Sequence, residues 1–463
     1  MVSLDDTIAA ISTPIGEGGI GIVRMTGPDA AAILRQLFAP GSGSGATDLE
    51  ARKLHYGHIL DPATGEMVDE VLAVHMPAPK TFTRQDVVEI NGHGGIVALR
   101  RILALCLRQG ARPAEPGEFT ARAFLNGRID LAQAEAVLDV VRAKTEASLR
   151  AAVGQLAGHL SDRVRSVRAT LVEALAYLEA SIDFAEDEIP ERDIGPDLEQ
   201  ARAGLRRLLA DAERGIIYRQ GVRAAIVGRP NVGKSSLLNR LLRTSRAIVT
   251  DIPGTTRDTL EETLNLQGVP VVLVDTAGIT AKAEGPIERL GIERSRAALA
   301  QADLALLVVD ASQPLTAADL SIAALVGDRP AIVTLNKIDL LDGGSRAALG
   351  SQFSVLNSSP RVPISALTGE GLEALEAAIV ETVFSGQAAA SEAPLVTNLR
   401  HKEALNRAFD HVEGACVAQR SNLPADLVAI DLAAAVNALG EITGQTASED
   451  LVETIFRNFC VGK

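Results

Sequence analysis

The segment that most constrains the fold is residues 228–235, GRPNVGKS, which follow an apolar run at Val222–Val227. The segment matches the pattern G-x-x-x-x-G-K-S, whose glycines let consecutive backbone N–H groups surround phosphate oxygens. Lys234 adds a positive charge beside the β- and γ-phosphates, and the Ser235 hydroxyl completes a magnesium shell. The helical pattern at residues 236–242 gives the required context after the loop. The pattern predicts an α/β domain that binds a nucleoside triphosphate.

A second loop, DTAG, follows the apolar run at residues 269–274. Asp275 can hold magnesium through a water molecule, and Gly278 can contact the γ-phosphate. Between this loop and the first, Thr255 and Thr256 each offer a hydroxyl to the same ion. These residues predict loops that respond to the γ-phosphate.

A third loop, NKID, follows the apolar run at residues 331–335 and predicts which base the nucleotide carries. Its last residue, Asp339, can accept both the N1–H and the exocyclic N2–H of guanine, whereas adenine offers neither donor. Residues 365–367, SAL, stand where a loop over the base is expected. The GTP-binding residues that we predict are Asn231, Val232, Gly233, Lys234, Ser235, Ser236, Thr250, Thr255, Thr256, Asp275, Thr276, Ala277, Gly278, Asn336, Lys337, Asp339, Ser365, Ala366 and Leu367.

One position departs from the pattern of small GTPases. In the Ras type, a glutamine directly after D-x-x-G orients the attacking water. Ile279 stands at that position here, and an isoleucine cannot orient water. Hydrolysis therefore needs another group and another source of charge stabilisation, so we expect slow turnover until something completes the site.

Composition limits the other functions of the chain. The 463 residues include 45 Lys+Arg and 59 Asp+Glu, for a net charge of -14, which argues against strong autonomous binding of nucleic acid. Cys106, Cys416 and Cys460 are far apart in sequence, so neither a disulfide framework nor a structural zinc site is expected. The start shows no secretory signal, and no apolar run is long enough to span a membrane. We expect a soluble cytoplasmic protein.

The chain length predicts about three domains, at roughly 150 residues each. We place the boundaries at residues 1–118, 119–220, 221–384 and 385–463. The first segment alternates β-branched runs with helical stretches, and the second predicts long helices, including residues 131–160. The last segment is helical and too short for a core of its own, so we expect it to pack on the second. The predicted fold class is multidomain α+β: an α/β N-terminal domain and an all-α domain interrupted by an inserted Ras-like α/β P-loop domain.

Segments outside the nucleotide loops carry a resemblance that runs from end to end. They are DTIAA at residues 6–10, GGIGIVR at 18–24, DVVE at 86–89, GHGG at 92–95, PGEFT at 116–120, RAFLNG at 122–127 and FCVGK at 459–463. With these segments, the whole chain resembles the MnmE (TrmE) family of tRNA-modification GTPases.

The resemblance implies a folate-binding N-terminal domain that also dimerises, a helical domain split by the G domain, and a homodimer. It also implies a partner of the MnmG type, dependent on FAD and NADH, in a heterotetramer or larger complex that holds tRNA. Together they would install an aminomethyl or carboxymethylaminomethyl group at C5 of the wobble uridine, position 34. The implied one-carbon donor is 5,10-methylene-tetrahydrofolate, with 5-formyl-tetrahydrofolate as the alternative ligand.

The resemblance also assigns residues to a folate site at the positions that match the family. Arg24, Glu89 and Arg128 fall where the ligand is held, together with Lys463 from the chain end. Glu89 could accept from the N–H pair of the pterin, and the three cations could bind carboxylates. Cys460 falls near this site, where a redox or other chemical role is implied.

Members of this family use potassium where other GTPases use an arginine finger, which fits the isoleucine after D-x-x-G. Potassium between the β- and γ-phosphates would neutralise charge that develops during transfer. The implied potassium ligands are Asn231, Thr250, Ile252 and Thr255. The implied magnesium ligands are Ser235 and Thr256, and the implied catalytic residues are Glu288, which would orient water, Lys234 and Thr256.

Two other functions remain as alternatives. A ribosome-assembly GTPase of the Era or Der kind would carry a basic RNA-binding module or a second G domain, and residues 385–463 offer neither. A one-carbon-transfer enzyme with a regulatory G domain would have the same kind of N-terminal domain as the tRNA-modification GTPase. Only the modified product would distinguish these two functions.

Overall fold

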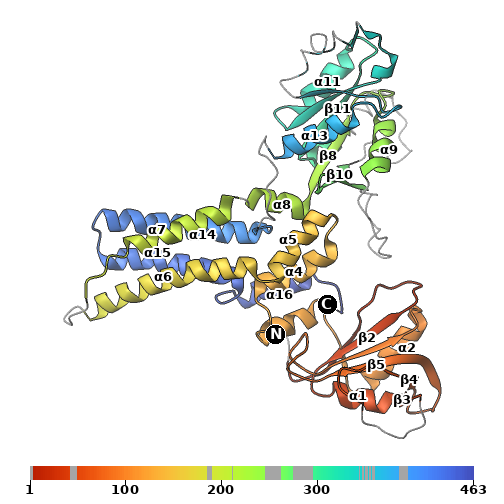
Figure 1. Ribbon diagram of the computed structural model, residues 1–463, viewed down its shortest axis with the longest axis vertical. Helices are drawn as coiled ribbons and strands as arrows, with labels where there is room; N and C mark the ends of the chain where they lie inside the picture. Colours follow the sequence, from red (N-terminus) through yellow and green to blue (C-terminus); the bar gives the residue numbers. More distant parts are fainter. Residues whose placement is uncertain are drawn as a thin grey trace.

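The computed structural model describes two sheets, each with its own helices, and a separate group of helices (Figure 1). The described residues are 4–41, 49–184, 190–210, 212–245, 262–274, 296–343, 345–346, 349, 353, 356, 360–384 and 395–462. Within them, no helix is both long enough and apolar enough to cross a bilayer. The multidomain α+β fold class is confirmed by these sheets and helices.

The N-terminal sheet has seven strands in the order β3-β4-β5-β6-β2-β1-β7, antiparallel except for the β1–β7 pair. Alternation along β2 sends Val23 and Met25 into the core with α1 and α2, while Arg24 points to the other face. This second face, called the open face below, is exposed at Tyr56 and Leu72 but is covered at β1, where Ile8 and Ala10 share a small core with Phe119. Its elements are β1 Ile8–Ile11, β2 Gly21–Thr26, α1 Ala30–Leu37, β3 Phe38–Pro40, β4 His55–Leu60, β5 Met67–Met76, β6 Val87–Gly92, α2 Ile96–Arg108 and β7 Arg112–Pro113.

The helices lie on both sides of the nucleotide segment in sequence and share one core. Leu171 of α6, Leu205 of α7, Leu405 of α14 and Leu439 of α15 are all fully buried in it. Burial of such side chains is the main source of stability in a helical bundle. The helices are α3 Glu118–Leu125, α4 Leu131–Arg142, α5 Glu146–Leu156, α6 His159–Asp183, α7 Gly195–Ala210, α8 Ala212–Gln220, α14 Leu399–Arg420, α15 Ala425–Thr443 and α16 Glu449–Arg457.

The single helical stretch predicted for residues 131–160 is wrong in detail, because it contains two helices. Helix α4 ends at Arg142, and α5 begins after Thr145, whose side chain accepts from the Ser148 N–H as an N-cap. Gly158 then adopts φ 95° before α6. An N-capping threonine inside an apolar periodic pattern marks a helix start, and this signal divides the stretch.

A buried carboxylate joins α4 to α14. Glu135 accepts hydrogen bonds from Nη2 of Arg400 and Nε2 of His401, each at 2.7 Å, and His401 is fully buried. Burial by itself would raise the pKa of Glu135, but its interactions with His401 and Arg400 outweigh burial and lower the pKa to about 2. The contact fixes the start of α14, which is the first helix after residue 384.

The second sheet has six strands in the order β13-β12-β11-β8-β10-β9, and only the β9–β10 pair is antiparallel. Helices α9 and α13 share a core with one face, and α11 shares a core with the other, so the central strands are buried on both sides as their apolar runs predict. The elements are β8 Val222–Val227, α9 Lys234–Ser245, β9 Glu262–Leu266, β10 Val269–Val274, β11 Leu304–Asp310, α11 Ala317–Val326, β12 Ala331–Asn336, η1 Ile338–Leu340, β13 Arg361–Pro363 and α13 Leu372–Val383.

The end of the chain packs against the segment that leads into α3. Val461 forms an isolated antiparallel bridge with Pro116, and the Cys460 carbonyl accepts from the Gly117 N–H at 3.3 Å. Gly117 has φ 69°, and a Cβ there would lie 2.7 Å from the Phe456 carbonyl oxygen. Glycine is therefore required at this position for both conformation and space.

Candidate functional site

The phosphate loop connects β8 to α9 at the carboxyl edge of the parallel strands, where open α/β sheets bind ligands. Gly233 has φ 99°, and a Cβ there would lie 2.2 Å from Nδ2 of Asn336. Asn231 also has a positive φ of 65°. The Lys234 ammonium donates to the carbonyls of Gly228 at 2.7 Å and Arg229 at 2.8 Å, and so folds over the loop. The loop has the close-approach geometry that phosphate binding requires.

Asn336 links the phosphate loop to the loop at residues 365–367. Its Nδ2 donates to the Val232 carbonyl at 2.8 Å, and its Oδ1 accepts from the Ala366 N–H at 3.0 Å. The side chain is 2% exposed, so both bonds lie out of water. Asn336 therefore holds the two loops in one arrangement, with the predicted phosphate and base regions on either side of it.

Asp339 and Ser365, both predicted at the base, lie in direct contact. Ser365 Oγ donates to Asp339 Oδ1 at 2.6 Å, and the Thr368 N–H donates to Ser365 Oγ at 3.1 Å. The bond orients the carboxylate, whose four lone-pair directions leave capacity for two further donors. Leu367, which was predicted to lie over the base, is 79% exposed in the same loop.

Asp310, which was not predicted from the sequence, supports this loop through the predicted residue Lys337. Lys337 has φ 68°, and its ammonium pairs with Asp310 Oδ2 at 2.7 Å. Burial would raise the pKa of Asp310, but hydrogen bonds from Lys337 and Ser312 outweigh it and hold the pKa below its ordinary value. The sequence signal for Asp310 was that it is the one acidic residue in β11 and ends this otherwise apolar strand.

The remaining predicted nucleotide and ion residues divide into two groups. Ser235 and Ser236 open α9 with exposed side chains, next to Lys234. The others lie outside the described residues: Thr250, Ile252, Thr255, Thr256, Asp275, Thr276, Ala277, Gly278 and Glu288, and with them Lys463 of the second site.

A second polar site lies on the open face of the N-terminal sheet. Arg24 of β2 and Glu89 of β6 are paired in register, and Nε and Nη2 of Arg24 donate to Glu89 Oε1 at 2.9 and 2.8 Å. Their side chains are 26% and 22% exposed, so the pair is accessible to a ligand. The Arg24 guanidinium carbon also lies 5.9 Å from the centre of the Phe119 ring.

Arg128 approaches the same aromatic cluster from the loop after α3. Its guanidinium lies over the Phe82 ring at 4.9 Å from the ring centre, and Phe82 packs against a small core that contains Phe119. The chain end is also close, since a Cβ at Gly462 would lie 2.8 Å from the Ile11 carbonyl of β1. The structure thus brings Arg24, Glu89 and Arg128 together around one aromatic cluster.

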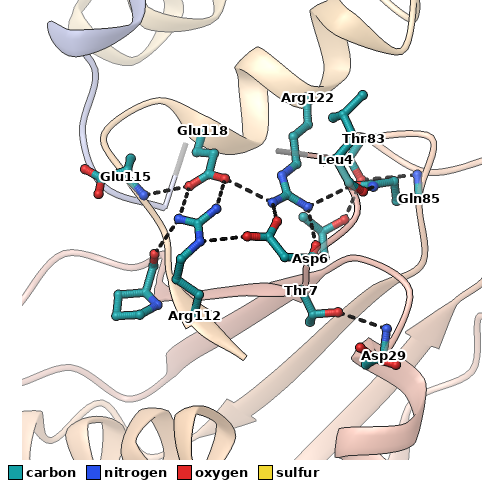
Figure 2. Close-up of polar contacts among 12 residues, drawn as sticks. Leu4, Asp6, Thr7, Asp29, Thr83, Gln85, Arg112, Glu115, Glu118 and Arg122 are labelled. Atoms are coloured by element: carbon teal, nitrogen blue, oxygen red, sulfur yellow. Dashed lines mark hydrogen bonds and ion pairs between the residues drawn. The ribbon is translucent and has the colours of Figure 1, made fainter. Parts of the chain in front are cut away.

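A buried ion-pair network supports this region (Figure 2). Arg122, fully buried on α3, donates to Asp6 Oδ1 at 2.5 Å and to Glu118 Oε1 at 3.0 Å, and Arg112 bonds the same two carboxylates at 2.8 and 2.7 Å. Burial would raise the pKa of Glu118, but its bonds from Arg112, the Glu115 N–H and Arg122 lower it below the ordinary value. The network was not predicted, because its members lie up to 116 residues apart.

The Arg122 guanidinium also reaches the loop that carries Phe82. Its Nη1 donates to Gln85 Oε1 at 3.2 Å, and Gln85 Nε2 donates to the Leu4 carbonyl at 2.7 Å. Figure 2 shows these side chains converging between the first strand and α3. The network therefore positions the loop that carries Phe82, which lies beside Arg128 in the second site.

Family models match both the segment that carries the second site and the helical segments. The model described as the GTP-binding protein TrmE N-terminus matches residues 7–128, and the one described as the MnmE helical domain matches residues 131–460. The chain belongs to the MnmE family. Curated relatives in this family are named tRNA modification GTPase MnmE. One from Roseiflexus castenholzii is 52% identical over 99% of both chains, and one from Carboxydothermus hydrogenoformans is 50% identical over 99% of this chain and 100% of the relative.

Solved structures match part of the chain. The G domain of the T. maritima FeoB iron transporter is 30% identical and covers 35% of this chain and 98% of that chain, with a TM-score of 0.25. As an MnmE-family GTPase, the chain binds GTP and is a GTP hydrolase.

Proposed function

We propose that the protein is a potassium-activated GTPase that modifies C5 of the wobble uridine of tRNA together with an FAD- and NADH-dependent partner of the MnmG type. The product would carry an aminomethyl or carboxymethylaminomethyl group, and methylene-tetrahydrofolate would supply the carbon. The observation that carries the proposal is the match over 99% of the chain to relatives named for tRNA modification. The family match at residues 7–128 disfavours an assembly factor of the Era or Der kind.

In the proposed GTP site, this chain's residues mainly position the phosphates and read the base. The Lys234 ammonium would exchange its two loop carbonyls for β- and γ-phosphate oxygens, and loop N–H groups would surround them. Asp339, oriented by Ser365, would accept the two N–H groups of guanine. Ser235, exposed at the start of α9, would hold magnesium with Thr256, and that ion would offset phosphate charge.

The potassium proposal rests on the residues around the phosphate loop. Asn231 projects from a left-handed backbone position directly before Val232, where its side-chain oxygen could meet a monovalent cation near the phosphates. Thr250, Ile252 and Thr255 would complete the set, and Glu288 would orient water in place of the glutamine that Ile279 replaces. Potassium would supply the charge neutralisation that an arginine finger supplies elsewhere.

The donor set of the second site fits a folate. A pterin presents adjacent N–H groups to a carboxylate such as Glu89, and the glutamate tail presents carboxylates to cations such as Arg128 and Lys463. Glu89 accepts two bonds from Arg24, so its orientation is already fixed for a ligand on the open face. Cys460 is exposed in the adjacent tail, which supports a chemical role near the folate.

The proposed assembly is a cytoplasmic homodimer that holds tRNA through its complex with the MnmG-type partner. A net charge of -14 supports shared rather than autonomous tRNA binding. The proposed domain boundaries, 1–118, 119–220, 221–384 and 385–463, are supported by the common core of α6, α7, α14 and α15, which makes the G domain an insertion.

The decisive experiment is mass analysis of tRNA nucleosides from cells that lack the protein. We expect the modified wobble uridine to disappear, to return with the wild-type gene, and to stay absent with Lys234→Ala or Arg24→Ala. An unchanged nucleoside profile in the deletion strain would overturn the proposal.

A further inference from the structure

Seven residues at the junction of two helices contact two distant parts of the chain. The α4–α5 connector, residues 142–148, runs from the last residue of α4 through the first turn of α5. One side of it touches the β9–β10 hairpin, and the other lies against the C-terminal tail, residues 458–462. The connector is therefore placed to join the nucleotide sheet to the end of the chain.

Short hydrogen bonds hold the connector to the nucleotide sheet. Thr145 Oγ1 donates to the Gly268 carbonyl at 2.8 Å, and Lys144 Nζ donates to Thr263 Oγ1 at 3.2 Å. Ser148 Oγ donates to the Tyr218 carbonyl at 2.5 Å, close to the start of β8. Thr145 is 6% exposed, so its bond is protected from water.

The hairpin extends from this contact toward the nucleotide. Its strands pair from Val269↔Leu266 at the turn to Leu273↔Glu262 at the far end. The far end continues into the DTAG loop on one side and into the segment that carries Thr255 and Thr256 on the other. The paired hairpin therefore joins the sequence neighbours of these two predicted loops to the turn that Thr145 holds.

The other side of the connector reaches the tail by packing and by a hydrogen bond. Arg142 Nη2 donates to the Asn458 carbonyl at 3.1 Å, and Leu138, one turn earlier on α4, packs with Phe456 and Phe459 in one core. Phe459 is followed directly by Cys460, whose carbonyl is bonded to the Gly117 N–H. A shift of α4 therefore acts on the tail where it meets the N-terminal sheet.

We propose that the α4–α5 connector couples the nucleotide site to the C-terminal tail, so that the identity of the bound nucleotide sets how firmly the tail is docked. Lys144 and Thr145 are the residues through which the hairpin acts. The coupling requires GTP binding and is independent of folate, potassium and tRNA, so it can fail while the proposed function stands. Since coupling between two sites is reciprocal, tail release must change relative nucleotide affinity by the same factor.

The cysteines give a direct readout of tail docking. Cys460 is exposed, while Cys106 and Cys416 are buried. Burial raises the pKa of the Cys106 thiol to about 12 and also raises the pKa of the Cys416 thiol, so neither competes for a thiol reagent in the folded protein. The labelling rate of Cys460 is compared in the full chain with GDP and with the GTP analogue GMPPNP. We expect the two rates to differ by about fivefold, the low end of ordinary coupling.

Variants of the connector then test the route. Thr145→Ala removes the bond to the Gly268 carbonyl, Thr145→Ser keeps a hydroxyl there, and Lys144→Met removes the bond to Thr263 without touching the N-cap of α5. Thr316→Ala is the matched control, because Thr316 is an N-cap of α11 in the same sheet domain and is not part of the connector. Nucleotide affinity and thermal melting are measured for each variant.

We expect the nucleotide-dependent ratio to persist in Thr145→Ser and Thr316→Ala and to fall toward one in Thr145→Ala and Lys144→Met. Labelling Cys460 in the wild type should shift the ratio of GDP to GMPPNP affinity by the same factor as the rates. Equal rates with both nucleotides in the wild type would overturn the coupling, and an undiminished ratio in Lys144→Met and Thr145→Ala would overturn the route. If Thr145→Ala melts below the assay temperature, the outcome with Lys144→Met decides.

Discussion

Replacing Asn336 by alanine tests whether this side chain holds the nucleotide loops together. The change leaves the Val232 carbonyl and the Ala366 N–H without their partner, at positions whose residues are 0% and 6% exposed. An unpaired buried polar group costs about 1–3 kcal/mol, so two of them should cost roughly 2–4 kcal/mol when water reaches them in part. Because both groups are unpaired with or without nucleotide, this cost lowers the free energy of unfolding, and nucleotide affinity should fall by more than about threefold because the two loops lose their common support.

The assay is equilibrium binding of fluorescent GDP, with thermal unfolding of the free protein measured in parallel. Asn336→Asp keeps the acceptor for the Ala366 N–H but turns a buried carboxylate oxygen toward the Val232 carbonyl, so it should lose at least as much as Asn336→Ala. Asn91→Ala, which removes an exposed asparagine bond to the Leu72 carbonyl, is the matched control. A loss below about threefold in Asn336→Ala, with unchanged melting, would refute the bridging role, since even one unpaired group should cost more.

Four further outcomes are expected. Asp339→Asn should weaken GTP binding and favour xanthosine nucleotides, and retained tight GTP binding in a competition assay would contradict its base-reading role. Glu288→Ala should keep nucleotide affinity and nearly stop hydrolysis, as followed by phosphate release; unchanged turnover would show that the carboxylate is misassigned. Potassium should raise GTP turnover severalfold over sodium at equal ionic strength, and equal rates would remove the potassium proposal. The pKa of Glu135 falls from 4.5 to about 2 on folding, so its bonds with His401 and Arg400 add stability above pH 4.5 that is lost as the pH falls toward 2; Glu135→Gln should flatten that part of the unfolding profile in acid titrations, and an identical profile would contradict the assignment.

Local sequence was enough to predict the nucleotide sheet and the loops at its edge. Gly233, Lys234 and Asp339 each follow a buried strand at fixed spacing, so a short window contains the whole signal. The bridge made by Asn336 was not predictable in the same way, because its two partners depend on the strand order β13-β12-β11-β8 in the folded sheet.

The buried ion-pair network was the feature that the sequence predicted least well. Arg122 reads as an ordinary helix charge, yet it is fully buried and bonded to Asp6, 116 positions away. Such a pair depends on how the segment before β1 is placed against α3 in the folded protein, and the sequence contains no periodic pattern that would reveal it. The division of residues 131–160 was visible in principle, because Thr145 and Gly158 are ordinary helix boundary signals.

The shared core of α6, α7, α14 and α15 has a consequence for biosynthesis. The apolar faces of α6 and α7 emerge from the ribosome before their partners exist, and roughly 190 further residues must be added at about 5–20 residues per second. Those faces are therefore unpaired for about 10–40 s, unless something in the cell covers them. The nascent chain should accordingly depend on chaperones most during synthesis of its nucleotide domain, and release from that dependence should coincide with the appearance of α15.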